Sequence, residues 1–319
     1  MSARGWAAFA AMSAIWGIPY LFIKIAVDDG LSPAFVSWVR VLMAAVVLLA
    51  LARRAGALGS LRGRWRWVAI YAVAEIALPF PLIAAGEQRV ASSLAAIVIA
   101  CVPLLVALIA LRVDPTERPT GLRLAGLLTG LAGVVVLVGV DVAGSTDELI
   151  GVGLIGLAAA GYAVGPMVLK AHLGDMDPRA AMGASLGVAT LVLTPFALAA
   201  PPTEMPTSES LLALAVLGLV CTALAFVIFS VLITEVGPSR ALVITYINPV
   251  VAVALGVAIL GEQPGAGAVA GLLLILAGSW LSTDGRLPPG LMRRLRAARP
   301  SRRAASEPSP LEPLAAPPR

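Results

Sequence analysis

Residues 237–262 of this 319-residue chain read GPSRALVITYINPVVAVALGVAILGE, a long apolar segment with an Asn-Pro pair near its middle. Such a segment can cross a bilayer, because a helix rises about 1.5 Å per residue and the hydrocarbon core is about 30 Å thick. Pro249 has no backbone N–H, so it leaves the carbonyl of Thr245 without its helical partner. Within hydrocarbon, that carbonyl must be satisfied by protein or by water in a cavity. The stretch therefore predicts a membrane-spanning helix that is broken at Asn248-Pro249.

A stretch in the first half of the chain repeats this pattern. Residues 91–118 are also apolar, and Pro103 precedes Pro249 by 146 residues. Four further pairs recur at a spacing of 145 residues: Glu117 and Glu262, Pro119 and Pro264, Gly126 and Gly271, Gly133 and Gly278. Such recurrence indicates an internal repeat. The sequence thus predicts a proline-broken helix in each half of the chain.

The composition is that of a membrane protein with many spans. Hydrophobic residues make up 59% of the chain and charged residues only 13%, and the mean hydropathy is +0.94. Soluble domains carry about 25% charged residues. Cys101 and Cys221 both lie within apolar segments, which argues against a disulfide framework or a metal site. The first apolar run is longer than the core of a cleaved signal peptide, so we expect it to be a retained first helix.

Ten apolar segments of membrane-spanning length account for most of the chain and leave no room for a separate soluble domain. They predict an all-α polytopic membrane protein with ten transmembrane helices. The predicted segments are residues 5–27, 33–52, 67–86, 90–111, 121–140, 151–170, 179–200, 210–233, 238–260 and 265–283.

The basic residues predict the orientation of these segments. With the N-terminus inside the cell, the inner loops and termini hold 20 of the 23 Lys and Arg residues. The outer loops hold only Arg89, while Lys24 and Arg40 lie within helices. Ten spans also return the C-terminus to the cytoplasm. The sequence pI of about 9.8 is therefore explained by topology rather than by binding to nucleic acid.

The repeat divides the chain into two five-helix halves, residues 1–140 and 151–283. Because five is odd, the second half is expected to cross the membrane in the opposite orientation. This inverted repeat is common in secondary transporters, whose substrates bind near the midplane between the halves. Residues 284–319 are rich in Pro, Arg, Ala and Ser, which predicts a disordered basic cytoplasmic tail that is attracted to anionic lipid.

Two short motifs imitate those of soluble enzymes. Residues 151–156 contain the GxGxxG pattern of dinucleotide-binding folds, with Asp175 at a suitable distance. Residues 183–187 spell the GxSxG nucleophile elbow, which needs a histidine after the serine, whereas the only histidine, His172, precedes it. We interpret both sets of glycines as small residues that let membrane helices pack closely. We therefore expect no enzyme, no cofactor and no metal site.

Charged side chains within the membrane are costly and so mark candidate functional sites. Lys24 and Arg40 lie in the outer half of the first two helices, and Glu75 lies near the middle of the third. We predict a midplane cavity for a small organic molecule, with Glu75 as its proton-linked or cation-binding group. Arg40 or Lys24 would contact an anion. Two alternatives stay open: Lys24 snorkels to the outer headgroups, and Glu75 pairs with Arg40.

Aromatic and polar side chains are expected to complete this cavity. Trp16, Tyr20 and Lys24 follow at a spacing of four residues, which places them on one face of a helix. An interfacial belt is the alternative for the two aromatic residues, and a helix-to-helix hydrogen bond is the alternative for Asn248. The predicted substrate-binding residues are Trp16, Tyr20, Arg40, Glu75, Tyr162, Tyr246 and Asn248. The predicted hinges are Pro79, Pro103 and Pro249.

The span from about residue 5 to residue 283 resembles the EamA-type transporters of the drug/metabolite transporter superfamily. The residues that carry the resemblance are Trp16-Gly17, Lys24, Ser32-Pro33, Arg40, residues 92–96 (SSLAA), Pro103-Leu104, residues 249–252 (PVVA), residues 260–262 (LGE), Gly271 and Gly278. The resemblance implies an inner-membrane carrier with two inverted five-helix repeats that moves metabolites by alternating access. Such carriers move amino acids, purines, sugars, nucleotide-sugars or drugs, so the substrate does not follow. The small multidrug transporters of the superfamily use a glutamate in their first helix, and this chain has none there.

Together these features predict a secondary transporter of amino-acid-like or amphipathic metabolites in a bacterial inner membrane. We expect an exporter, a monomer or homodimer, whose partners are lipid and a small-molecule substrate and not nucleic acid. One alternative is an importer of an anionic metabolite that uses Arg40 and Lys24. From a different class, a lipid scramblase or a membrane scaffold remains a second alternative.

Overall fold

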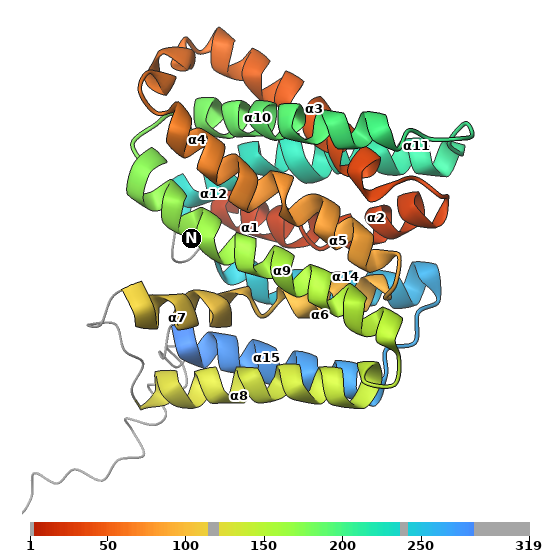
Figure 1. Cartoon of the computed structure of the whole chain (residues 1–319). Coiled ribbons are helices and arrows are strands. Elements are labelled where there is room, and N and C mark those ends of the chain that lie inside the picture. The colour runs from red at the N-terminus through yellow and green to blue at the C-terminus, as the bar shows by residue number, and fades with distance from the viewer. Residues whose placement is uncertain (1–2, 114–120, 237–241, 284–319) are drawn as a thin grey trace, which may run out of the picture. The chain divides into compact units, whose positions relative to one another are not determined.

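The computed structural model describes residues 3–113, 121–236 and 242–283, which form helices joined by short connections and contain no β-strand (Figure 1). Within these residues, eight helical spans are long and apolar enough to cross a membrane, and Ile244–Leu260 and Ala266–Leu281 are two shorter apolar helices. The prediction of an all-α polytopic membrane protein is confirmed. The predicted tail, residues 284–319, and Glu117 and Pro119 of the repeat lie outside the described residues.

The first half contains α1 (Ala3–Ile15), α2 (Pro19–Asp28), α3 (Pro33–Arg54), the 3-10 turn η1 (Ala57–Leu61), α4 (Trp65–Ala72), the π-helix η2 (Val73–Ala77), α5 (Pro79–Glu87), α6 (Ser92–Ile99), α7 (Val102–Val113), α8 (Leu122–Leu137) and the π-helix η4 (Val138–Val142). The second half contains α9 (Thr146–Val168), the π-helix η5 (Leu169–Leu173), α10 (Pro178–Ala199), α11 (Ser208–Ala215), the π-helix η6 (Val216–Leu224), α12 (Ala225–Val236), the 3-10 turn η7 (Leu242–Tyr246), α14 (Asn248–Leu260) and α15 (Ala266–Thr283).

The start and end of α3 show why these segments are helical. The Ser32 hydroxyl accepts a hydrogen bond of 3.3 Å from the Phe35 N–H, and Pro33 occupies the first helical position, where its missing N–H costs nothing. Arg53 and Arg54 in the last turn place positive charge at the negative end of the helix dipole. Both ends of this span are therefore encoded locally.

Prolines interrupt the helices where the repeat predicts it. α6 ends at Ile99 and α7 begins just before Pro103, while η7 gives way to α14 just before Pro249. Each proline removes one N–H from the helical ladder, so the helix is easily interrupted there. The predicted break in each half is present, and a hinge function of these prolines stays a prediction.

The first span contains a further break, which its apolar pattern does not reveal. α1 ends at Ile15 and α2 begins at Pro19, and a turn joins them. Gly17 of this turn touches α14 so closely that a Cβ there would lie 2.6 Å from the Val251 Cβ. Trp16 therefore does not share one continuous helix face with Tyr20, and that part of the prediction is wrong.

Two extensive helix contacts join helices that are equivalent in the repeat: α8 with α15 and α3 with α10 (Figure 1). Both pairs are antiparallel. In the second pair, Trp38 Nε1 donates a hydrogen bond of 3.0 Å to Thr194 Oγ1, whereas Leu48, further along α3, meets Gly183, near the start of α10. Antiparallel packing of equivalent helices is the arrangement that an inverted repeat requires.

The α8–α15 contact is made through glycines of the repeat. A Cβ at Gly278 would lie 2.6 Å from the Gly126 carbonyl oxygen, and a Cβ at Gly133 would lie 2.9 Å from the Gly271 carbonyl oxygen. In the repeat, Gly126 corresponds to Gly271 and Gly133 to Gly278. The contact of Gly278 with Gly126 is therefore equivalent to the contact of Gly133 with Gly271. Reciprocal contacts of this kind characterise an interface with two-fold symmetry.

The glycines of the two enzyme-like motifs divide into two groups. At Gly151 and Gly183, a Cβ would lie 2.9 and 3.1 Å from its nearest neighbour, so both glycines allow close packing as we interpreted them. At Gly153 and Gly156, a Cβ would meet nothing within 4 Å, and that interpretation is wrong for them.

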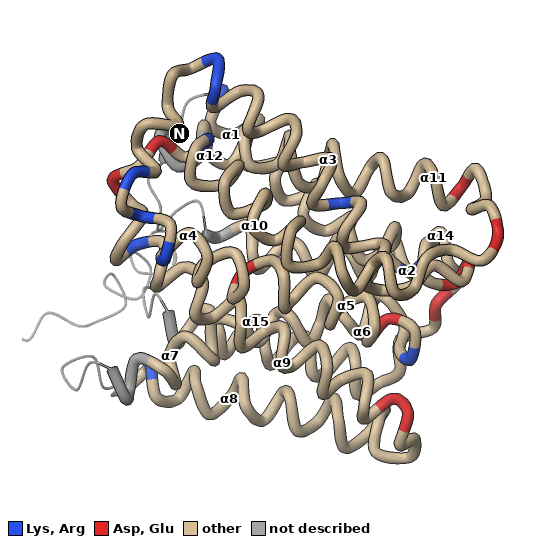
Figure 2. Tube along the Cα trace, turned by 45° about the horizontal axis from the view of Figure 1, so that its top comes forward, with Lys and Arg blue, Asp and Glu red and all other residues tan. Residues whose placement is uncertain are grey.

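Charge is divided between the two ends of the helices (Figure 2). Lys and Arg gather at the end that carries the connection from α3 to α4, whereas most Asp and Glu lie at the end that carries the connection from α10 to α11. We call these the basic end and the acidic end. Such a division is what the positive-inside rule produces in a membrane protein.

Candidate functional site

Arg40 is buried on the face of α3 that meets η6, with 8% of its surface exposed. Its Nε donates a hydrogen bond of 2.9 Å to Thr222 Oγ1, and the guanidinium carbon lies 4.0 Å from the centroid of the Phe80 ring. A hydroxyl and an aromatic face orient the guanidinium without neutralising its charge. Among the described residues, no hydrogen bond occupies the two terminal nitrogens, which leaves them available to an anion.

Among the described residues, Arg40 has no acidic partner at ion-pair distance. The salt bridges among the described residues join other groups, and none includes Arg40 or Glu75. The alternative in which Glu75 pairs with Arg40 is therefore wrong for this structure. A buried cation without a counter-ion is costly, which makes a functional role the default interpretation.

Glu75 lies on η2, in the middle of the third span. Pro79 cannot donate an N–H to the Glu75 carbonyl, and the helix widens so that the Leu78 N–H bonds to the Val73 carbonyl at 3.0 Å. The Glu75 side chain packs on Gly165 of α9, where a Cβ would lie 2.9 Å from the Glu75 Cδ. Its Oε2 is buried without a hydrogen-bond partner in the described part of the chain. The π-helix thus presents an unpaired carboxyl group to α9.

Two tyrosines, Tyr20 and Tyr162, lie near Arg40. Tyr162, on α9, interacts electrostatically with both Arg40 and Glu75, and Tyr20, on α2, interacts with Arg40 and Tyr162. Neither phenol has a hydrogen-bond partner among the residues that the structure describes. The structure thus brings four predicted site residues together from α2, α3, η2 and α9. The set offers one cation, one acid and two phenols.

Lys24 is held at the acidic end. Its Nζ donates a hydrogen bond of 2.8 Å to the main-chain carbonyl of Glu87 and forms an ion pair of 2.9 Å with Asp28. Both interactions keep the ammonium group at the ends of α2 and α5. Arg40 is consequently the better candidate for an anion contact.

The other three predicted residues contribute to contacts between helices. Trp16 packs against the ring of Phe229, with centroids 4.8 Å apart. Asn248, with its amide nitrogen as the donor, reaches the main-chain carbonyl of Ser13 at 3.1 Å, which is the helix-to-helix bond that was the alternative for this residue. The Tyr246 hydroxyl donates a hydrogen bond of 3.3 Å to the Ser279 carbonyl.

The sequence did not reveal three residues that matter here. Phe80 and Thr222 orient Arg40, but in the sequence they are an ordinary aromatic residue and an ordinary threonine within apolar runs. Glu87 is fully buried, although it lies at the edge of a predicted segment and resembles a loop residue. For Glu87, a signal was present: it is one of the few acids that directly follow an apolar run.

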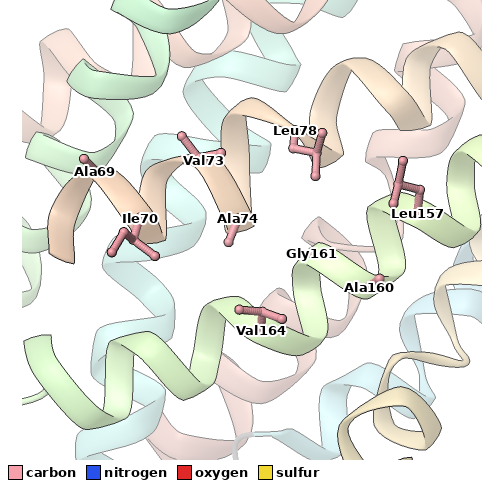
Figure 3. A pocket seen from close by; sticks show the side chains of 9 residues that line it. All are labelled: Ala69, Ile70, Val73, Ala74, Leu78, Leu157, Ala160, Gly161 and Val164. Carbon is pink, nitrogen blue, oxygen red and sulfur yellow. The ribbon is translucent and has the colours of Figure 1, made fainter. Parts of the chain in front are cut away.

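A groove of about 600 Å³ runs between the third span and α9, beside the turn that carries Glu75 (Figure 3). Only apolar residues line it: Ala69, Ile70, Val73, Ala74, Leu78, Leu157, Ala160, Gly161 and Val164. A second cavity of about 300 Å³ lies near Ala34 and Phe196. Neither cavity is lined by a predicted substrate-binding residue.

Glu262 joins the two halves at the acidic end. It follows α14, and its carboxylate accepts hydrogen bonds of 2.7 and 3.0 Å from the N–H groups of Ser92 and Ser93 at the start of α6. A carboxylate is favourable at a helix N-terminus. Burial raises the pKa of Glu262, but its hydrogen bonds with Ser93 and Ser92 outweigh burial and lower the pKa below its ordinary value.

We expect Glu262→Gln to destabilise the fold, because an amide accepts the hydrogen bonds from Ser92 and Ser93 less well than a carboxylate does. The loss should be only about 1 kcal/mol, since the side chain is partly exposed. The pKa of Glu262 is lower in the folded protein than in the unfolded chain. Its stabilising effect is therefore fully present above the unfolded-state pKa and is lost as the pH falls through the folded-state pKa. Thermal unfolding in detergent at a series of acidic pH values measures this. Wild type should lose stability on acidification more steeply than Glu262→Gln, with the exposed Glu204→Gln as the matched control. Parallel pH profiles of wild type and Glu262→Gln would contradict the prediction.

Comparison with known proteins gives two matches to one family. The EamA-like transporter family matches residues 3–139 and again residues 149–283. The chain is 31% identical over 258 residues to YedA, an uncharacterized inner membrane transporter of Escherichia coli (strain K12), which covers 79% of this chain and 81% of that one. It is 26% identical over 282 residues to an uncharacterized transporter of Archaeoglobus fulgidus, which covers 84% of this chain and 93% of the relative.

The fold is also found in a solved crystal structure. That structure superposes with a TM-score of 0.63 at 22% identity and covers 88% of this chain and 98% of its own. At this identity the likeness shows the architecture alone.

Proposed function

Because the chain belongs to the EamA-like transporter family, we propose that it is a secondary transporter that exports small organic metabolites across a bacterial inner membrane. That it is a membrane transporter follows from the family, from the named relatives and from its apolar spans. The substrate class, the direction and the mechanism are our proposal.

The observation that carries the proposal is the set formed by Tyr20, Arg40, Glu75 and Tyr162. The terminal nitrogens of Arg40 offer a carboxylate two parallel hydrogen bonds. Glu75 suits a cationic group or a proton, and the two phenols suit the body of the molecule. An amino-acid-like or amphipathic molecule with charge at one or both ends matches this set best.

Alternating access is the proposed mechanism, with residues 1–140 and 151–283 as the two moving halves. The antiparallel packing of equivalent helices, the reciprocal glycine contacts and the two family matches support an inverted repeat. Pro79, Pro103 and Pro249 lie at helix interruptions and are the proposed hinges.

Two alternatives differ in what the site would bind. An importer of an anionic metabolite is favoured by Arg40, whose positive charge has no counter-ion among the described residues. For a scramblase we expect a polar groove that opens to lipid, whereas the groove beside η2 is lined by apolar residues alone. The apolar lining instead suits the apolar part of an amphipathic substrate or a lipid chain.

The charge division supports an orientation with the basic end, and both termini, in the cytoplasm. In that orientation the acidic end faces the periplasm. The proposed unit is a monomer or a homodimer surrounded by lipid, without cofactor or metal.

Proteoliposomes test the proposed function directly. Vesicles that contain the purified full chain are loaded with a mixture of amino acids and other small metabolites, and the compounds that leave are identified by mass spectrometry. We expect selective loss of a few compounds relative to protein-free vesicles. An unchanged mixture in both preparations would overturn the proposal.

Glu75→Gln is expected to reduce flux driven by a pH gradient about tenfold or more, which corresponds to about 1.4 kcal/mol. Glutamine keeps the size and polarity of the side chain but cannot exchange a proton. Flux of an identified compound is measured with and without a pH gradient. If the variant retains the pH dependence of wild type, Glu75 does not couple transport to protons.

A further inference from the structure

Glu87 is a fully buried acid that the proposed substrate site does not use. It is the last residue of α5, and 0% of its surface is exposed. Both carboxylate oxygens are buried, and neither has a hydrogen-bond partner in the described part of the chain. Buried polar groups nearly always have partners. An unpaired acid within a membrane protein is therefore a candidate functional group.

The charged neighbours of Glu87 do not form a closed ion pair with it. The groups that interact with its carboxyl group electrostatically are Lys24, Asp28, Arg40, Glu262 and Tyr20. Lys24 is the nearest cation, but its ammonium group binds the main-chain carbonyl of Glu87 and the carboxylate of Asp28. Two of the other neighbours, Asp28 and Glu262, are acids that disfavour a second negative charge.

Lys24 provides two arrangements for this cluster. In the observed one, its ammonium pairs with Asp28 and the Glu87 carboxyl group stands alone. Because Lys24 already touches the backbone of Glu87, a rotation of its flexible side chain brings the ammonium to the carboxyl group. A lone carboxyl group in a low-dielectric site is tolerated when it carries a proton, and an ionised one is tolerated when a cation neutralises it. The two arrangements of Lys24 therefore suit the two charge states of Glu87.

Resting on the proposed transport function, we propose that Glu87 is a second proton-binding site, which takes up and releases a proton at the acidic end during the transport cycle. It follows Glu75 by 12 residues in the same span, which places it about 18 Å further along the helix. The span thus carries one acid at mid-depth and one near its end. Glu262, whose carboxylate binds the start of α6, also interacts electrostatically with Glu87, so opening of the acidic end at this contact would expose Glu87 to water.

Infrared spectroscopy tests the proton site without a substrate. The full chain is reconstituted in liposomes and titrated with acid and base, and the carbonyl stretch of protonated buried carboxyl groups is followed. We expect a band that disappears as the pH rises, that is absent in Glu87→Gln and that persists in Glu75→Gln and in the exposed control Glu204→Gln. An unchanged titrating band in Glu87→Gln, or no titrating band in wild type, would overturn the proposal.

The same infrared titration of the Lys24→Met variant distinguishes a Glu87 that exchanges a proton from a Glu87 that has only a structural role. Loss of the ammonium group that bonds to the main-chain carbonyl of Glu87 should move the disappearance of the band to higher pH, whereas a carboxyl group that never ionises would show no shift. Glu87→Asp covers the case in which Glu87→Gln does not fold, because it keeps the carboxyl group and should keep a titrating band.

Transport measurements decide whether the proton is used. Flux of a compound identified in the vesicle screen should lose its stimulation by a pH gradient in Glu87→Gln, while exchange of the same compound without a gradient persists. Full stimulation in the variant would overturn a coupling role. If wild type moves no compound, the proposed transport function fails, and the infrared titration still decides the proton site.

Discussion

Replacement of Gly278 by alanine should push α15 away from α8 and destabilise the protein by about 3 kcal/mol or more. The new Cβ would lie 2.3 Å from the backbone nitrogen and 2.5 Å from the Cα of Gly130. Backbone atoms within a helix cannot rotate aside as a side chain does, so the two helices would have to separate. Small residues let membrane helices approach closely enough for van der Waals contact to hold them together. Loss of that contact affects one of the most extensive helix pairs in the fold.

Thermal unfolding of detergent-purified protein measures this effect. Gly156→Ala is the matched control, because a Cβ there meets nothing within 4 Å, and alanine favours a helix by about 1 kcal/mol relative to glycine. We expect a large loss of stability for Gly278→Ala and none for Gly156→Ala. Equal melting temperatures for the two variants would show that α8 and α15 are not in close contact in the membrane protein.

Arg40→Met is expected to abolish most transport while leaving the fold intact. If the guanidinium binds a carboxylate of the substrate, its removal should lower flux about a hundredfold, the effect of about 3 kcal/mol. Stability should stay the same or rise, because an apolar side chain of similar length replaces a buried charge without a counter-ion. Thr222 keeps its hydrogen bond of 2.8 Å to the Leu217 carbonyl in the absence of Arg40.

The separation of activity from stability is what distinguishes a substrate contact from a structural residue. Melting temperature and flux are measured on the same preparations, with Arg54→Met at the exposed basic end as the control. A variant at position 40 that transports normally but unfolds early would mean that Arg40 serves the fold and not the substrate.

The spans and the repeat could be predicted because neither requires knowledge of which helices touch. The length of an apolar segment is a local signal, and the prolines at 103 and 249 and the recurring glycines show the repeat when the two halves of the sequence are compared. The break at Trp16 could not, because it depends on the contact between Gly17 and Val251, which lie far apart in the sequence. The sequence pattern predicts helices and many of their interruptions. An interruption that depends on close packing against another helix, as at Gly17, can be seen only in the folded structure.

The candidate site divides in the same way. Charge within apolar segments correctly drew attention to Arg40 and Glu75, which the structure brings to one region with Tyr20 and Tyr162. Their partners were beyond the reach of the sequence: the expected pair of Glu75 and Arg40 is absent, and Phe80 takes the place of an acid. A sequence shows that a buried charge is present, but only the packing shows what faces it.

The hydrogen bonds between Glu262 and the start of α6 hold the acidic end closed, and water can take the place of either partner. The carboxylate of Glu262 is partly exposed and can bond to water instead, whereas Ser92 and Ser93 are buried, so their N–H groups meet water only when the acidic end opens. A closure held this way biases the populations of a closed and an open end without locking either. The modest differential affinity of a bound molecule is then enough to shift that balance.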